Sequence, residues 1–292
     1  MFQIGEHNFT STPLEPGLYI VATPIGNLRD ITIRALETLS ACDLLACEDT
    51  RMTRRLLDRY AIAKRPIAYH EHNAEKAGAE ILGALVEGKS VALVSDAGTP
   101  LISDPGYRLV VETREAGFPV FTIPGASAVI AALSVSGLPT DDFRFCGFLP
   151  NKEKARQDKL ATLRAEQTTL VFYEAPGRLT KALQAIAEVM GAERQVVVAR
   201  ELTKRYETIV SGAAKGIAQA FAVDAVKGEI VILIEPAGDQ SPSWSDEEIE
   251  RLLADLAAEM PASKAAKTAA EKTGLAKADL YQRIVSQKAE NG

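Results

Sequence analysis

The stretch VALVSDAGTPLISDPG (residues 91–106) joins an apolar run to a loop of unusual composition. The run 91–94 predicts a buried strand, and the loop 95–106 carries two aspartates, two glycines and two prolines before a helix expected from Tyr107. In open α/β sheets, ligands bind beyond the carboxyl ends of the strands. The stretch therefore predicts a ligand site, with a plain proline-glycine turn as the alternative.

The residues of this loop indicate what it would bind. Asp96 follows the strand closely, where its carboxylate can accept hydrogen bonds from ribose hydroxyls or an ammonium group, and Gly98 lets the backbone approach a ligand. Asp104 is interpreted as a turn residue. The loop contains no lysine, so it is poorly suited to a polyphosphate and favours a compact ligand with hydroxyls and a positive charge.

Strands and helices alternate on both sides of the loop within residues 1–140. Strands are predicted at 17–23, 43–47, 66–70, 91–94 and 119–123. The helices between them include one capped by Asp30 and one over 73–87. This alternation predicts an N-terminal α/β domain with a parallel sheet covered on both faces.

The pattern changes between residues 141 and 238, where a second α/β domain is predicted. Its strands are expected at 143–149, 168–174, 195–201, 206–212 and 228–235, with helices at 152–165, 177–190 and 213–222. The short spacing between the strands at 195–201 and 206–212 permits an antiparallel hairpin, so a mixed sheet is expected.

A helical tail is predicted for residues 239–292, after a linker at 236–244. Ser245 can cap its first helix with Glu248 as the capping-box partner, and two short basic helices follow around Gly274. Residues 261–288 hold six Lys/Arg against two acidic residues. The tail therefore resembles a helix-turn-helix unit, with a partner-binding helical tail as the alternative.

Composition limits the class of protein. The net charge is -6, so a nucleic-acid substrate needs a local basic surface. No apolar run is long enough to span a membrane, and the N-terminus does not resemble a secretory signal. Cys42, Cys47 and Cys146 are too few for a disulfide framework and are expected to be reduced. We therefore expect a cytoplasmic protein with no membrane partner.

Two apparent motifs are set aside. GALVEGKS (83–90) has the letters of a phosphate-binding loop, but here a helix precedes it and a strand follows, which is the reverse of the required order. HEHN (70–73) is interpreted as the capped start of a helix rather than a metal pair, and no metal site is expected.

Similar chemistry follows other strands, and together these segments carry a resemblance. They are ATPIGNLRDITIRALETL, EDTRMTRRLL, ALVSDAGTPLISDPG, PGASA, SGLPTDDFRFCGFLP, FYEAPGRL and ARELTKRYE. The chain resembles the tetrapyrrole methylase superfamily of S-adenosylmethionine (SAM) enzymes, most closely the ribosomal branch that methylates a cytidine 2′-oxygen in 16S rRNA. One departure is Gly177, where the family pattern has histidine.

The resemblance implies that SAM binds in a cleft between the two domains. The cofactor-binding residues it implies are Pro24, Asp96, Gly98, Thr99, Ser127, Ala128, Phe172 and Tyr173. It also implies 16S rRNA in the small ribosomal subunit as the partner, with methylation in the decoding region, and we expect a homodimer.

Methyl transfer to a ribose hydroxyl requires in-line placement and a base. The candidate bases are Glu48, Asp49, Glu201 and Lys204. Basic residues flanking the strand ends can neutralise RNA phosphates, namely Arg29, Arg34, Arg51, Arg54, Arg55, Arg178, Lys204 and Arg205. Two alternatives remain, a precorrin or porphyrin methylase on the same fold and a non-catalytic RNA-binding protein.

Overall fold

The computed structural model describes residues 1–223, 226–238 and 245–290. The chain divides into two compact units, residues 1–236 and 237–292. Within the described ranges, no helix combines the length and the apolar character that crossing a membrane requires.

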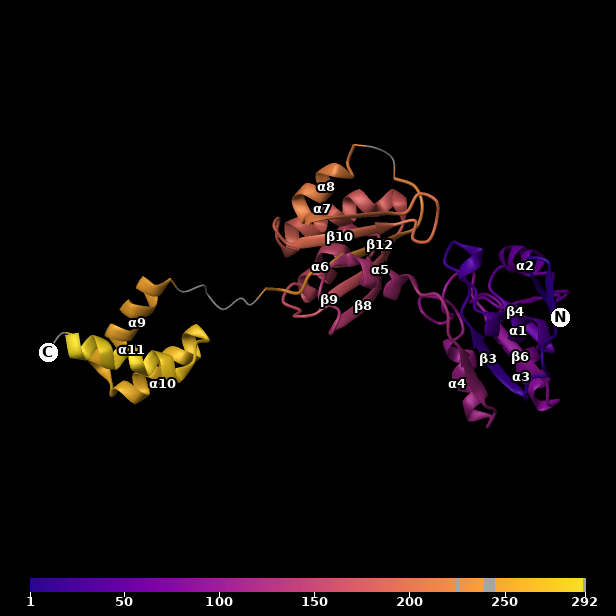
Figure 1. The fold of residues 1–292 in the computed structure, drawn as a ribbon, viewed down its shortest axis with the longest axis horizontal. Helices are drawn as coiled ribbons and strands as arrows, with labels where there is room; N and C mark the ends of the chain where they lie inside the picture. Colours follow the sequence, from indigo (N-terminus) through magenta and orange to yellow (C-terminus); the bar gives the residue numbers. More distant parts are fainter. Residues whose placement is uncertain (224–225, 239–244, 291–292) are drawn as a thin grey trace. The chain divides into compact units, whose positions relative to one another are not determined.

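The first unit contains a five-stranded parallel sheet in the order β5-β4-β6-β3-β7. Its strands are β3 (Gly17–Val21), β4 (Leu44–Cys47), β5 (Ile67–Ala68), β6 (Ser90–Val94) and β7 (Val120–Ile123). The strands β3, β4 and β6 are labelled in Figure 1. β6 lies at the centre and is buried along its whole length, as expected for a strand covered on both faces. The predicted parallel sheet is confirmed.

Helices cover both faces of this sheet. They are α1 (Ile33–Ala41), α2 (Thr50–Arg59), α3 (Ala74–Val86) and α4 (Tyr107–Glu115). Successive residues of a strand point to opposite faces, so Val94 packs with α1 and α2 whereas Leu93 packs with α3 and α4. Because all five strands are parallel, their carboxyl ends lie at the same edge of the sheet.

A second sheet in the same unit has the order β11-β10-β12-β9-β8. Its strands are β8 (Phe143–Phe148), β9 (Thr169–Glu174), β10 (Gln195–Arg200), β11 (Thr208–Ala213) and β12 (Ile230–Ile234). β8 and β9 are parallel and the other pairs antiparallel, so both the mixed sheet and the β10–β11 hairpin are confirmed.

This second sheet is also covered on both faces. One face carries α6 (Glu153–Leu163), α7 (Leu179–Met190) and α8 (Ala214–Ala220), and the other carries α5 (Ala128–Ser136). The alternation of side chains places Phe172 on the α6–α7 side and Val171 on the α5 side.

The second unit is a three-helix cluster of α9 (Asp246–Glu259), α10 (Ala262–Thr273) and α11 (Lys277–Glu290). The predicted capping box of Ser245 and Glu248 is present, and Gly274 ends α10 in the left-handed conformation. Arg283 joins α11 to α9 through Asp246 at 2.9 Å. Most of the predicted linker, residues 239–244, lies outside the described residues.

Two details of the first unit differ from the expectations. Asp30 does not cap α1: it ends a short 3-10 helix, η1 (Leu28–Asp30), and Thr32 is the cap because its Oγ1 accepts from Ala35 N at 3.1 Å. An unexpected N-terminal hairpin pairs β1 (Phe2–Ile4) with β2 (His7–Phe9), and its Phe2 is buried in the core.

The motifs set aside from the sequence have local structural roles. Within GALVEGKS, α3 runs through Val86 and Gly88 adopts a positive φ of 75° just before β6, so the predicted order is confirmed. Asn73 is the N-cap residue of α3, but its side chain bonds His70 N and Ala68 O instead of capping the helix. No cluster suited to a metal ion occurs in the part of the chain that the structure describes.

Candidate active site

The loops at the carboxyl ends of β3, β4 and β6 are bonded to one another. Thr23 and Gly98 exchange two backbone hydrogen bonds of 2.8 and 3.0 Å, and Gly98 has a positive φ of 81° that glycine adopts without strain. The Asp96 Oδ1 atom accepts from Asp49 N at 2.9 Å. These bonds fix the edge of the first sheet at which the predicted site lies.

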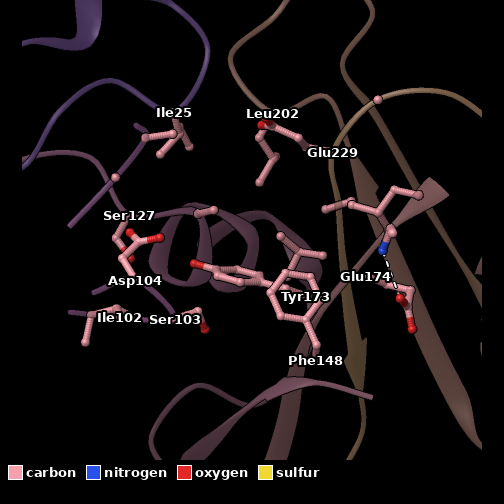
Figure 2. A pocket seen from close by; sticks show the side chains of 18 of the residues that line it. Ile25, Ile102, Ser103, Asp104, Ser127, Phe148, Tyr173, Glu174, Leu202 and Glu229 are labelled. Carbon is pink, nitrogen blue, oxygen red and sulfur yellow. Dashed lines mark hydrogen bonds between the residues drawn. The ribbon is translucent and has the colours of Figure 1, made fainter. Parts of the chain in front are cut away.

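A cavity of about 380 Å³, here the first cavity, is formed by this edge and the second sheet (Figure 2). Its lining consists of Ile25, Ala97, Gly98, Thr99, Ile102, Ser103, Asp104, Ser127, Ala128, Phe148, Tyr173, Glu174, Ala175, Pro176, Ala199, Leu202, Gly228, Glu229, Ile230 and Val231. Five predicted cofactor residues are among them, namely Gly98, Thr99, Ser127, Ala128 and Tyr173. The cavity has the size and mainly apolar walls typical of a small-molecule site.

The first cavity is lined by acidic side chains but by no basic ones among the described residues. Three carboxylates line it, those of Asp104, Glu174 and Glu229, and no Lys, Arg or His is among its described lining residues. Burial raises the pKa of Asp104, and the Tyr173 hydroxyl, whose own pKa burial also raises, is directed toward that carboxylate in Figure 2. Such a cavity disfavours phosphates and favours a ligand that carries positive charge.

Glu174 is a special case among these carboxylates. Its side chain is fully buried, and Arg178 Nε lies 2.9 Å from its Oε1 atom. Burial raises the pKa of Glu174, while the Ala175 N–H and Arg178 oppose the shift. Arg178 also donates to the backbone oxygen of Leu149. Its guanidinium is therefore already engaged by Glu174 and Leu149, although the side chain is 30% exposed, and the contact of Arg178 with RNA stays a prediction.

A second cavity of about 320 Å³ adjoins the first. The two share Ile25, Ala97 and Glu229. The second cavity is lined by Thr23, Pro24, Ile25, Gly26, Leu28, Met52, Thr53, Arg55, Leu56, Ser95, Asp96, Ala97, Lys204 and Glu229. Pro24 and Asp96, expected to hold the cofactor, thus line this second cavity and not the first.

Phe172 reaches neither cavity. It is wholly buried in the core between the second sheet and α6 and α7, because Tyr173, the next residue of β9, takes the cavity-facing side. The predicted cofactor role of Phe172 is corrected on this ground.

The four candidate bases fall into two groups. Glu48 and Asp49 follow β4, and burial, with Asp104 and Asp96 nearby, raises the pKa of Glu48. Hydrogen bonds from Arg51 lower the pKa of Asp49 to about 2, and Asp49 caps α2. Glu48 therefore binds a proton more readily than Asp49, and neither residue is among the lining residues of the two cavities described here.

Glu201 and Lys204 form an ion pair beside the second cavity. Lys204 Nζ lies 2.8 Å from Glu201 Oε1 and 3.0 Å from Glu229 Oε2. The bond from Lys204 lowers the pKa of Glu201. Burial acts to lower the pKa of Lys204, but the hydrogen bonds to Glu201 and Glu229 outweigh it and raise this pKa. Their ion pair thus favours the charged form of both residues, and their role as bases stays a prediction.

The other arginines predicted to contact RNA differ in whether a carboxylate already pairs with them. Arg51 pairs with Asp49 and Arg54 with Asp58, at 2.7 and 2.9 Å. Of the arginines predicted to contact RNA, Arg29, Arg34, Arg55 and Arg205 are exposed and have no carboxylate partner in the described ranges. Arg34 donates to the backbone oxygen of Thr122.

Several residues of the first cavity were not predicted from the sequence. Asp104 was in the quoted loop but was interpreted as a turn residue, and Glu174 ended a quoted strand without a role. Ile25 was in the quoted segment after the first strand but was given no role, and Glu229 carried no signal, because only the packing of the second sheet against the first edge brings it to the cavity.

Comparison with known proteins relates this geometry to a family. The model of the tetrapyrrole (corrin/porphyrin) methylases matches residues 17–218, and that of the RsmI C-terminal HTH domain matches residues 245–288. Relatives from several bacteria are named ribosomal RNA small subunit methyltransferase I. The one from Mesorhizobium japonicum is 53% identical over 99% of this chain and 98% of its own length. The one from Escherichia coli O157:H7 is 50% identical over 92% and 95%.

A solved structure of cobalt precorrin-4 methyltransferase has the same fold, with a TM-score of 0.58 and 20% identity over 75% of this chain and 94% of that one. The predicted family and fold class are confirmed. The chain belongs to the tetrapyrrole methylase family, and within it to the branch of ribosomal RNA small subunit methyltransferase I.

Proposed function

We propose that this protein is a SAM-dependent methyltransferase of 16S rRNA, which methylates the ribose 2′-oxygen of a cytidine in the decoding region. Full-length relatives with 53% and 50% identity support methylation of small-subunit rRNA. The observation that carries the cofactor assignment is the first cavity, with three carboxylates and no basic side chain among its described lining residues.

The residues of the first cavity fit SAM. The molecule has an adenine, a ribose, an amino acid and a sulfonium cation, but no phosphate. Apolar residues such as Ile102 and Leu202 suit the adenine, and Thr99 and Ser127 offer hydroxyls to polar groups. Asp104 offers a carboxylate to the positive charges, and Asp96 and Pro24 approach from the neighbouring wall. When bound, SAM supplies an electrophilic methyl group.

The protein's own residues position and deprotonate the acceptor. Of the four candidate bases we assign Glu48 as the acceptor of the 2′-hydroxyl proton, because it follows β4 at the same sheet edge, close to Asp96 and Asp104, and burial raises its pKa, although it lines neither cavity. Exclusion of water by the apolar walls strengthens the electrostatic contacts inside the site.

Exposed basic side chains around the site bind the RNA backbone. Arg29, Arg55 and Arg205 are exposed cations that neutralise phosphates, and the helical tail adds further basic residues. The assignment divides the chain into residues 1–140, 141–238 and 239–292, and the substrate implies the cytoplasm. A homodimer is consistent with the exposed Ile130 and Val135 on the apolar helix α5.

Mapping of ribose methylation by mass spectrometry tests the proposal. Small-subunit rRNA from cells with and without this protein is compared, and purified protein is titrated with SAM by calorimetry. We expect one cytidine to lose its 2′-methyl group in the deletion strain. Unchanged rRNA, together with intact SAM binding, would instead favour a small-molecule substrate.

A further inference from the structure

The exposed face of α2 carries a row of arginines. Arg51, Arg55 and Arg59 are spaced four residues apart, so they lie on one face of the helix, and all three are exposed. At about 1.5 Å per residue, the row is about 12 Å long. It begins at the carboxyl edge of the first sheet, because Asp49, the N-cap residue of α2, closely follows β4. The row therefore extends from the candidate active site along α2.

The charges of this row are all positive, which is unusual beside the other ion pairs of the chain. Like charges four residues apart on a helix repel and destabilise it, whereas opposite charges at that spacing stabilise it. On α2 itself Arg54 pairs with Asp58, and on α4 Arg108 pairs with Glu112. In the row, the residue four positions after an arginine is twice another arginine. This spacing costs the helix some stability and favours binding of an anion.

Two arginines of the row are free to bind such an anion. Arg51 is held by Asp49 at 2.7 Å. Arg55 and Arg59 have no carboxylate within pairing distance in the ranges that the structure describes. Arg55 also lines the second cavity, and Arg59 was given no role from the sequence. The free cations thus begin at the candidate active site and continue beyond it.

A further arginine joins the row from η1. The Tyr60 hydroxyl donates to Leu28 O at 2.7 Å and so holds η1 against the end of α2. Arg59 Cζ lies 6.0 Å from the centre of the Tyr60 ring. Burial raises the pKa of Tyr60, and Arg59 and Arg29 oppose this rise whereas Asp30 adds to it, so both cations lie near the same hydroxyl. Arg29 is exposed and has no paired carboxylate among the described residues.

We propose that Arg29, Arg55 and Arg59 bind phosphates of one RNA strand, which runs from the candidate active site along α2. This inference rests on the proposed function and assigns the path of its substrate. The whole chain has a net charge of -6, so a polyanion is bound only where cations gather locally. Guanidinium groups form two parallel hydrogen bonds with a phosphate. A row of cations without acids therefore suits a uniformly charged backbone better than a protein surface of mixed charge.

Two variants of the full-length protein test the role of Arg59. Arg59→Ala removes the charge, and Arg59→Lys keeps it. Arg114→Ala is the matched control, because Arg114 is also an exposed arginine in the last turn of its helix, without a paired carboxylate in the described ranges, and α4 covers the opposite face of the first sheet.

Each protein is titrated with SAM by calorimetry and assayed for methyl transfer to small subunits purified from cells that lack this protein. Binding to these subunits and to their protein-free rRNA is measured at several salt concentrations. The salt dependence counts the phosphates that are neutralised, and the comparison of the two substrates separates RNA contacts from contacts with ribosomal proteins.

We expect Arg59→Ala to raise the KM for subunits about 5-fold, the upper end of the usual worth of an exposed ion pair, with kcat and SAM affinity within twofold of wild type. The magnitude of its log-affinity versus log-salt slope should fall by about 0.7–0.9, and Arg59→Lys should keep the wild-type slope. Arg114→Ala should behave as wild type. Both alanine variants lose the same contact with a helix C-terminus, so their melting temperatures should change alike.

Several results would overturn the inference. Wild-type KM and salt slope in Arg59→Ala, or equal losses in both alanine variants, would leave Arg59 a helix-terminal residue only. Weaker binding to subunits with unchanged binding to protein-free rRNA would assign the row to a ribosomal protein. A lower kcat or SAM affinity would place its effect in the active site. If the wild-type protein binds SAM but transfers no methyl group to these subunits, the proposed function itself fails, and this inference with it.

Discussion

Replacement of Asp104 by asparagine should weaken SAM binding more than the same change at Asp96. Asp104 lines the first cavity, where no basic side chain among the described lining residues competes for its charge. Asp96 lines the second cavity and already accepts from Asp49 N. Hydrogen bonds to charged groups contribute about 1.5–3 kcal/mol, so Asp104→Asn should lower the affinity roughly 10- to 150-fold.

Calorimetric titration with SAM at pH 7 measures both variants. Asp158→Asn is the matched control, because Asp158 is an exposed carboxylate on α6 outside both cavities. The position of Asp96 directly after β6 favours the opposite order when the sequence is considered alone. If Asp96→Asn loses more affinity than Asp104→Asn, that order is right, and the positive charges of the cofactor lie toward the second cavity.

The pH dependence supplies an independent readout. Burial raises the pKa of Asp104, so its charge, and the affinity for a cation, are lost on acidification at a pH above the ordinary range of an aspartate. Asp104→Asn should remove this dependence. A carboxyl whose pKa is higher in the folded than in the unfolded state makes the fold less stable as the pH rises through that pKa. The ligand-free Asp104→Asn protein should therefore melt at the same temperature or higher at pH 7.

Three further predictions concern the base, the tail and the buried ion pair. Glu48→Gln should bind SAM normally but lower turnover about 100- to 10,000-fold in the small-subunit assay, and near-normal turnover would exclude Glu48 as the base. A chain ending at Gly238 should bind SAM normally and RNA weakly, with a log-affinity versus log-salt slope shallower by about 0.7–0.9 for each phosphate that the tail neutralises. Unchanged affinity and slope, with a lower melting temperature, would make the tail a structural support. Arg178→Ala removes the nearest cation from the buried Glu174 carboxylate, which keeps its hydrogen bond from Ala175 N, so unfolding in denaturant should show a free energy of unfolding that is lower by about 1–3 kcal/mol.

The fold was predictable where one local rule governed each element. Apolar runs such as 91–94 could only be buried strands, and the capping box at Ser245 needs nothing beyond its own turn. Asp30 shows the limit of that approach, since two residues in the same segment can cap a helix. The outcome depended on the short helix η1, which moved the start of α1 to Ile33.

The site was predictable only as far as the sequence marks the ends of strands. Thr99 and Ser127 lie on loops of the first sheet, and the parallel arrangement brings them together. The division into two cavities depends on which face of β9 meets the first sheet and on where Glu229 lies. Those are consequences of tertiary packing, so the sequence placed Phe172 and Asp96 in the same pocket as Tyr173.

Backbone strain is concentrated at the same place as the proposed chemistry. Five non-glycine residues of the described chain have positive φ, and four lie in two loops beside the cavities, namely Leu101, Ser103, Glu201 and Thr203. Such conformations cost about 1–3 kcal/mol each and persist only where the surroundings hold them. Glycines next to these residues leave the space that their side chains occupy. A Cβ atom on Gly106 would lie 3.2 Å from the Leu101 side chain, and one on Gly228 would lie 2.4 Å from that of Glu201. The strained loops thus pack closely against glycines, and they carry Ser103, which lines the first cavity beside Asp104, and Glu201, which pairs with Lys204 of the second.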